Sequence, residues 1–208
     1  MKTIIKTMLL CAVATCLFSC EDFLTKIPET SLSPENYFSS EKELALWVNQ
    51  DMNNILPGAD DMAAIKGDDY IGKVLDAVQK GTRNTATNGL WTQGNWGKLR
   101  HINEFFANCH KCNDEEVRAK YMGIEYFLRA WFYYEMLCYY GDVPYYDYVL
   151  ASDDQESLMK ARDSRGYIAW KIISDLDNAA AVLPDSWPEG GARVDKYAAC
   201  SEVKSLSF

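Results

Sequence analysis

The stretch Tyr126-Phe-Leu-Arg-Ala-Trp-Phe-Tyr-Tyr-Glu-Met-Leu137, which runs on into Tyr140-Gly-Asp-Val-Pro144, decides the fold class. Apolar residues recur at helical spacing before and through it, namely Val117, Tyr121, Ile124, Leu128 and Trp131. Phe127, Tyr134 and Cys138 widen this stripe, which indicates a helix that packs on two sides, as in stacked helix pairs. Asp114 is the expected N-cap, and Gly141 followed by Pro144 ends the helix after Tyr140.

Two helices are predicted upstream of this stretch. Ser40 and Glu43 form a capping-box pattern, so a helix begins there and stops at Pro57-Gly58. The region 60–97 is rich in glycine and therefore predicts loops. A second helix is expected from about Leu90 to about His110.

One helix is predicted downstream. Asp163 or Ser164 caps it, and Pro184 ends it. No segment alternates with period two for long enough to indicate a strand. The sequence therefore predicts an all-α protein in which helices pack as antiparallel pairs.

The N-terminus has the pattern of an export signal. Lys2 and Lys6 precede an apolar run of about thirteen residues, which is too short to span a membrane. The run ends at Leu17-Phe-Ser-Cys20, the pattern that a lipoprotein signal peptidase accepts. We expect a signal peptide over 1–19, and a lipid anchor on Cys20 followed by an extended tether to residue 36. The alternative is an ordinary signal peptide with a chance cysteine.

Composition limits the function classes. The 189 residues after Ser19 suit one domain with a real core. The formal net charge is -9, and the resulting repulsion disfavours nucleic acid and anionic lipid. Neither a Gly-x-Ser-x-Gly motif nor a phosphate loop occurs, so the sequence indicates no enzyme and no cofactor.

Three groups of motifs together resemble the SusD/RagB family of outer-membrane nutrient-binding lipoproteins. Near the N-terminus these are Ser19-Cys-Glu-Asp-Phe-Leu24 and Pro34-Glu-Asn-Tyr-Phe38. The second group is the 126–137 and 140–144 stretch quoted above. The third comprises Arg162-Asp163, Ile172-Ile-Ser-Asp-Leu-Asp177 and Leu183-Pro184. Their order and spacing agree with the family across the chain up to about Pro184.

The resemblance implies a fold and a location. It implies TPR-like helix pairs, and hence a SusD-like helical domain over 37–208. Family members run to roughly twice this length, so the domain is expected to be incomplete at its C-terminus, where Lys196-Tyr-Ala-Ala199 only begins an alanine-rich helix. Glu21-Asp22 resembles the acidic tag that directs such lipoproteins to the outer face of the outer membrane.

The resemblance also implies a function. A glycan, or a peptide, would be captured at the cell surface and passed to a partner TonB-dependent, SusC-like transporter. A protein-interaction scaffold of helix pairs, or a non-functional truncated fragment, is the alternative. A third hypothesis is an exported thiol enzyme that uses Cys109 and Cys112.

A ligand site is predicted around Trp91, Asn95 and Trp96, with Arg83 and Asp69 upstream. Sugars need an aromatic surface for their C–H faces and short polar groups for their hydroxyls, and this region supplies both. Family members place part of their glycan site on loops of the helical half. The alternative is that both tryptophans only pack helices together.

Two further groups invite a metal or redox interpretation. Cys109-His-Lys-Cys112 has the spacing of a redox motif or half a zinc site, whereas inert thiols or a local disulfide are the simpler interpretation. Asp60, Asp61, Asp68 and Asp69 are potential calcium ligands, but no Asp-x-Asp-x-Asp-Gly loop is present and a solvated acidic loop is favoured. No metal site is therefore predicted.

Arg129 lies within an otherwise apolar helix face. A buried charge needs a partner, and we expect an acid such as Glu125 or Asp142 to supply it. Its role is expected to be architectural.

Overall fold

The computed structural model describes residues 37–58, 75, 77, 80–82, 84, 89–188 and 193–206. All helices in these ranges belong to the compact unit Pro34–Phe208. The expected signal peptide, Cys20 and the tether up to residue 36 lie outside the described residues, as do the acids from Asp60 to Asp69 and Arg83. Extended pairing in the described part is limited to one isolated bridge between Val143 and Asp163.

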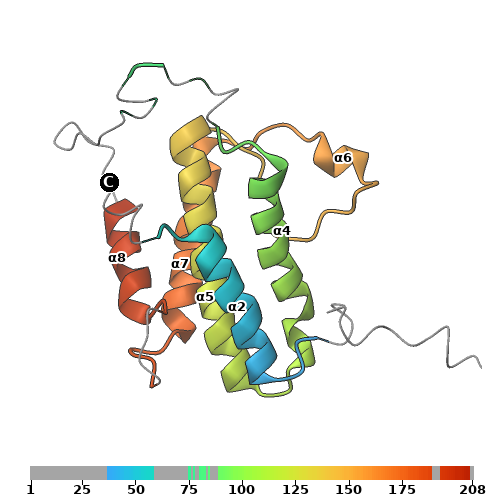
Figure 1. Cartoon of the computed structure of the whole chain (residues 1–208), viewed down its shortest axis with the longest axis vertical. Helices are drawn as coiled ribbons and strands as arrows, with labels where there is room; N and C mark the ends of the chain where they lie inside the picture. The colour runs from blue at the N-terminus through green and yellow to red at the C-terminus, as the bar shows by residue number, and fades with distance from the viewer. Residues whose placement is uncertain are drawn as a thin grey trace, which may run out of the picture. The chain divides into compact units, whose positions relative to one another are not determined.

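Helices account for the architecture. They are α2 (Glu41–Ile55), α4 (Gln93–Asn108), the 3-10 turn η2 (Cys109–Lys111), α5 (Glu115–Tyr140), α6 (Gln155–Leu158), α7 (Arg165–Val182) and α8 (Lys196–Leu206). The long helices alternate in direction, so that each is antiparallel to the next along the chain (Figure 1). This confirms the predicted all-α class with antiparallel, TPR-like helix pairs.

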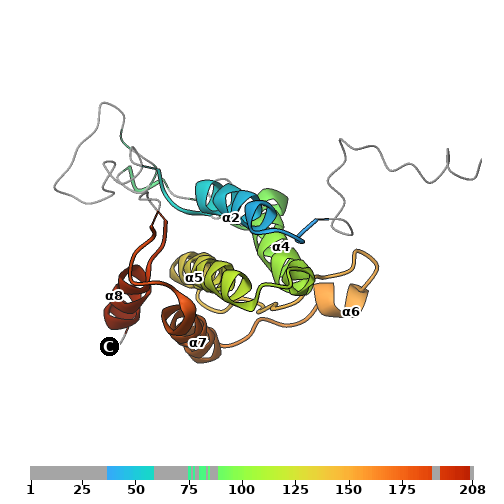
Figure 2. The same ribbon diagram turned by 90° about the horizontal axis from the view of Figure 1, so that it is seen from below.

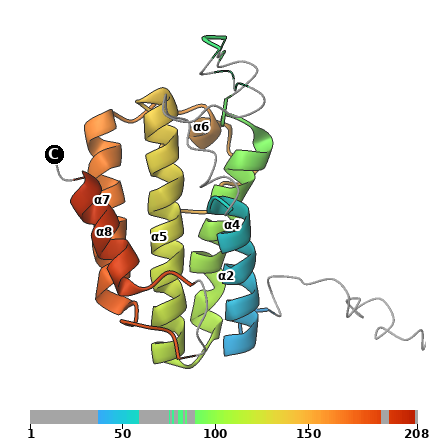
Figure 3. The ribbon, with the colours of Figure 1, turned by 60° about the vertical axis from the view of Figure 1, so that its left-hand side comes forward.

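The long helix α5 is central. It contacts α2 and α4 on one side and α7 on the other, and α8 packs on α7. Viewed along the helices, α2 and α4 form one layer, α5 lies in the middle, and α7 and α8 form the opposite layer (Figure 2). A side view shows the same order (Figure 3). The broad apolar stripe of α5 exists because the helix is covered from both layers.

Local capping explains where the helices begin. Ser40 and Glu43 form the predicted capping box of α2, and Asp114 accepts from the Val117 amide at the start of α5. For α7 the cap is Ser164, whose hydroxyl accepts from Tyr167 N–H. The predicted helix at Leu90 begins three residues later, because Thr92 supplies its cap.

The predicted end of α5 is also confirmed. Gly141 has φ 71°, a conformation that glycine adopts without strain, and its N–H bonds Leu137 O. An added Cβ there would lie 3.1 Å from the Arg165 guanidinium. The turn at Gly141 therefore both ends α5 and allows the start of α7 to come close.

Arg129 has a different partner from the one expected. Its Nε and Nη2 bond the two carboxylate oxygens of Asp175 on α7, at 2.8 and 2.7 Å. Burial alone would lower the pKa of Arg129, but the hydrogen bonds and charge of Asp175 raise it. Neither Glu125 nor Asp142 makes this contact, so that prediction was wrong. The pair ties α5 to α7, and its role in the fold is architectural.

A second buried polar group joins the other layer to α5. Asp51 of α2 shares a 2.6 Å hydrogen bond with His101 of α4, whose ring is stacked on Trp47. Glu125 of α5 is fully buried beside Asp51. Burial, followed by the charge of Asp51, raises the pKa of Glu125 well above its ordinary value. A neutral carboxyl at Glu125 is therefore the favoured form in the folded protein.

Within the described residues, none of the helices combines the length and the apolar character needed to cross a membrane.

Candidate functional site

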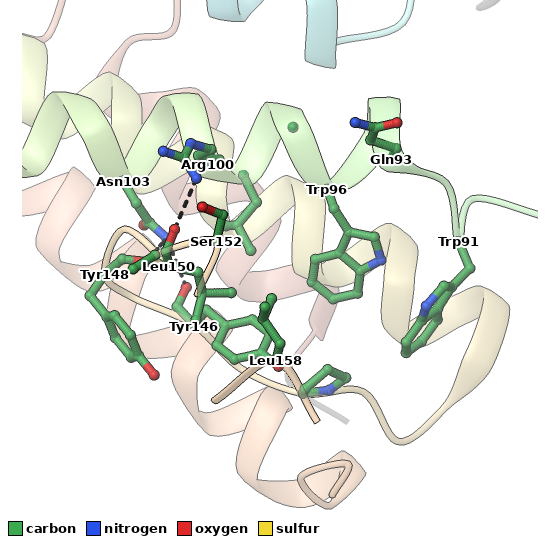
Figure 4. Close-up of a pocket in the computed structure, with 14 residues that line it drawn as sticks. Trp91, Gln93, Trp96, Arg100, Asn103, Tyr146, Tyr148, Leu150, Ser152 and Leu158 are labelled. Atoms are coloured by element: carbon green, nitrogen blue, oxygen red, sulfur yellow. Dashed lines mark hydrogen bonds between the residues drawn. The ribbon is translucent and has the colours of Figure 1, made fainter. Parts of the chain in front are cut away.

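A pocket of about 580 Å³ lies between α4 and the segment 144–158. Aromatic and apolar side chains dominate its lining (Figure 4). The residues that line it are Trp91, Gln93, Trp96, Gly97, Leu99, Arg100, Asn103, Pro144, Tyr146, Tyr148, Leu150, Ala151, Ser152 and Leu158. Its volume suits a small organic ligand or a few sugar rings.

Helix α4 supplies one wall of the pocket. Trp96, Arg100 and Asn103 follow each other at intervals of four and three residues, so they lie on one face of the helix. This face lines the pocket, and its Trp96 also meets the ring of Phe132 on α5 at 5.6 Å between centroids, whereas Ile102 and Phe105 of α4 lie in the core.

The segment 143–150 supplies the opposite wall. Its even-numbered residues from Pro144 to Leu150 line the pocket. Its odd-numbered residues Tyr145 and Asp147 contact α7 instead, through Asp175 and Lys171. This alternation is that of an extended chain, in which successive side chains point to opposite sides.

Side chains of α4 hold this wall in place. The amide of Asn103 donates to Tyr146 O at 3.2 Å and to Tyr148 O at 3.0 Å, and Arg100 Nη1 donates to Leu150 O at 2.9 Å. Three carbonyls, two residues apart, are thus satisfied by one helix face without a neighbouring strand (Figure 4). The hydroxyl of Tyr133 accepts from Tyr146 N at 2.6 Å from the core side.

Packing fixes the two tryptophans at one end of the pocket. The rings of Trp91 and Trp96 meet edge to face at 5.2 Å, and Trp91 meets Tyr140 in the same way at 5.3 Å. The backbone N–H of Trp91 donates to Tyr140 Oη at 2.8 Å, and the Arg162 guanidinium lies 4.9 Å from the Trp91 ring. Trp91 remains 42% exposed although its position is fixed. It is therefore preorganised as a surface for another apolar face.

The predicted site residues separate into three groups. Trp91 and Trp96 are together in the pocket. Asn95 is buried on the other side of α4, where its amide contacts Met136 Sδ at 3.6 Å, so its side chain does not face the pocket. Arg83 and Asp69 lie outside the described residues.

Sequence reasoning missed Arg100, Asn103, Tyr146 and Tyr148. The sequence could have indicated Arg100 and Asn103, because they follow Trp96 at intervals of four and three residues and so share its face of a helix. The same spacing places Asn95 on the buried stripe of Leu99 and Ile102, of which only Leu99 also lines the pocket. No short-range signal marks Tyr146 and Tyr148, since their place depends on Asn103 more than forty residues away.

The chemistry of the lining suits binding. Gln93 and Ser152 are exposed and offer an amide and a hydroxyl, and Arg100 is the single charged residue in the lining. The Arg100 charge is already paired with Glu104 at 3.0 Å. Burial raises the pKa of the Tyr146 hydroxyl, which donates to Ser157 O at 2.8 Å. The lining therefore offers aromatic surface and neutral hydrogen-bonding groups.

The cysteines predicted as a possible redox or zinc pair are free and buried. Burial raises the pKa of the Cys109 thiol, whereas a reactive thiol needs a lowered one. Among the residues with described positions, no cluster of three or more His, Cys, Asp or Glu side chains could hold a metal ion. These facts favour the interpretation as inert thiols.

Known proteins resemble this chain in sequence. A profile of SusD-like proteins, described as starch-binding and associating with the outer membrane, matches residues 99–205. SusD-like protein P2 of Formosa agariphila is 25% identical over 189 residues, which cover 82% of this chain and 36% of that protein. The chain thus spans little more than a third of the length of this relative.

Solved structures share the fold. A SusD-like protein from Bacteroides fragilis superposes with a TM-score of 0.70 at 23% identity, over 87% of this chain and 37% of the other. A laminarin-binding SusD-like protein gives a TM-score of 0.62 at 15% identity, over 80% of this chain and 39% of the other. At these identities the likeness concerns the fold.

Proposed function

The chain belongs to the SusD-like family, and from this premise we propose that it is a surface lipoprotein that binds glycan nutrients in the pocket between α4 and segment 143–150. Binding, not catalysis, is its task. Peptide is the alternative nutrient class.

One observation carries the proposal. The pocket presents fixed aromatic rings and neutral polar groups side by side, which is what a sugar with apolar C–H faces and hydroxyls requires. Trp91 and Tyr148 are 42% and 47% exposed, so both have surface available for a ligand. The related laminarin-binding structure supports a carbohydrate as the ligand class.

The anchor and the partner belong to the same proposal. Residues 1–19 would be removed as a signal peptide, and acyl chains on Cys20 would hold the protein on the outer face of the outer membrane, with Glu21-Asp22 as the surface tag. A SusC-like, TonB-dependent transporter would receive the glycan. The acidic composition is consistent with a protein that binds no nucleic acid.

A saccharide screen tests the pocket. The full chain in detergent is screened against laminarin, starch, xylan and mannan, and affinities for the binders are measured by calorimetry. We expect Trp91→Ala or Trp96→Ala to weaken binding at least tenfold, which is about 1.4 kcal/mol. Tyr197→Ala is the matched control, because it removes an aromatic ring that is 65% exposed on α8.

Other results would direct the interpretation elsewhere. If saccharides do not bind but peptides do, the nutrient class is wrong while the pocket stands. If neither binds and a transporter is retained in pull-down, the chain is a scaffold. Unchanged saccharide affinity in both tryptophan variants would mean that saccharides bind somewhere other than this pocket.

A further inference from the structure

A second group of aromatic side chains lies on α7, on the other side of segment 143–150 from the pocket. Tyr167 and Trp170 are three residues apart on the helix and are 42% and 59% exposed. Their ring planes are inclined by only 33°, with centroids 6.2 Å apart. Exposed rings that adjoin one another form a contiguous apolar patch, and such patches mark interaction sites, whereas singly exposed rings do not.

A polar pair accompanies these rings. The Lys171 ammonium lies 5.7 Å from the Tyr167 ring, 5.6 Å from the Trp170 ring and 4.8 Å from the Tyr145 ring. Asp147 Oδ2 is 3.4 Å from the same ammonium, and its side chain is 45% exposed. The α7 platform, defined as Tyr167, Trp170, Lys171 and Asp147, thus combines aromatic surface with a donor and an acceptor.

The pocket and the α7 platform are separated by one extended segment. Tyr146 and Tyr148 face the pocket, whereas Asp147 between them pairs with Lys171 of the platform. Residues that serve the two sites are thus neighbours along the chain, where consecutive Cα atoms are about 3.8 Å apart. A linear polymer of several sugar rings that passes over the edge of this segment would contact both sites.

We propose that the α7 platform is a second glycan-binding site, which holds a further part of the same polysaccharide that occupies the pocket. This inference rests on the proposed function for the ligand class, but it concerns different residues. Two linked contacts raise the affinity for a long ligand through a high effective concentration, and a short ligand gains nothing. The platform would therefore select for chain length.

The first test follows the indole N–H signal of Trp170 by NMR. The full chain, labelled with ¹⁵N in detergent, is titrated with laminarin, starch, xylan and mannan, and signals are assigned with Trp→Phe variants. We expect each polysaccharide that shifts Trp91 or Trp96 to shift Trp170 as well. If Trp170 stays unmoved while the pocket signals shift, the platform proposal is wrong and the proposed function stands. If no saccharide shifts any of the three, both are wrong.

The second test compares ligand lengths. We expect Trp170→Ala to weaken binding of the polysaccharide roughly tenfold while affinity for a trisaccharide of the same linkage stays unchanged. Tyr197→Ala, the control on α8, should change neither affinity. Equal losses for both ligands, or no loss for either, would contradict length selection by the platform. Circular dichroism confirms that each variant is folded.

Discussion

At the scale of single residues, Glu125 is the side chain whose state depends most on its surroundings. It is fully buried, and the group it faces is the carboxyl of Asp51, with which it can share a hydrogen bond only when one of the two carries a proton. Its raised pKa means that the folded protein keeps a proton there to a higher pH than the unfolded chain does. Stability from this site is therefore greatest in acid and is lost as pH rises above the ordinary carboxyl range.

We expect Glu125→Gln to flatten this pH dependence. The free energy of unfolding of the wild type should fall between pH 5 and pH 8, by up to about 1.4 kcal/mol per pH unit from this group. The variant should show a shallower slope and be the more stable protein at pH 8, as measured by urea denaturation. Glu156→Gln, at an exposed acid on α6, serves as the control. Parallel curves for Glu125→Gln and wild type would contradict the neutral carboxyl.

Residues also show what sequence reasoning can reach. The sequence predicts that Arg129 needs an acidic partner, because the arginine lies in an apolar helix face. The sequence does not identify Asp175 as that partner, because Asp175 lies 46 residues away on α7 and is brought near only by the packing of the two helices. The sequence indicated a carboxylate one turn away, but Glu125 turns toward α2 and Asp51 instead.

At the scale of elements, close contact between α5 and α7 depends on one glycine. A Cβ at Gly123 would lie 2.8 Å from Leu183 Cγ and 2.9 Å from Val182 Cγ2, which is closer than packed atoms approach. Gly97 in α4 has no such neighbour within 4 Å. Glycine is a poor helix former at both positions, so the two sites isolate the packing contribution.

We therefore expect opposite effects from the same substitution. Gly123→Ala should lower the free energy of unfolding by about 1–3 kcal/mol, because the helices must move apart. Gly97→Ala should raise it by about 0.5–1 kcal/mol through helix propensity. Thermal and urea denaturation followed by circular dichroism measure both. If Gly123→Ala were more stable than the wild type, α7 would be able to move away from α5 without a loss of stability, and this prediction would be wrong.

Elements differ in how far the sequence predicts them. The caps at Ser40 and Asp114 and the stop at Gly141 depend on residues within one turn, so they could be predicted. The short helix α6 and the wall 143–150 could not. Among the described residues the wall pairs with extended chain only at Val143, and its carbonyls at 146, 148 and 150 are satisfied by Asn103 and Arg100 from a distant helix.

At the scale of the whole molecule, the family is associated with the outer membrane. Our proposal assigns the attachment to Cys20, which ends the lipoprotein signal pattern Leu17-Phe-Ser-Cys20. We expect Cys20→Ser to move the protein from the membrane pellet to the soluble fraction and to abolish incorporation of labelled palmitate. Cys138→Ser, at an exposed cysteine of α5, should leave both unchanged. A Cys20→Ser protein that stays in the pellet and keeps its label would disprove the anchor.

The wall between pocket and α7 has a consequence for how such a protein can diverge. Because alternate positions of 143–150 face opposite ways, Tyr148 and Leu150 can be exchanged to suit a new ligand while Tyr145 and Asp147 keep their contacts to α7. The backbone that carries them is fixed by helix side chains that do not depend on the residues exchanged. Positions that can change with the ligand and positions that are constrained by α7 therefore alternate within eight consecutive residues.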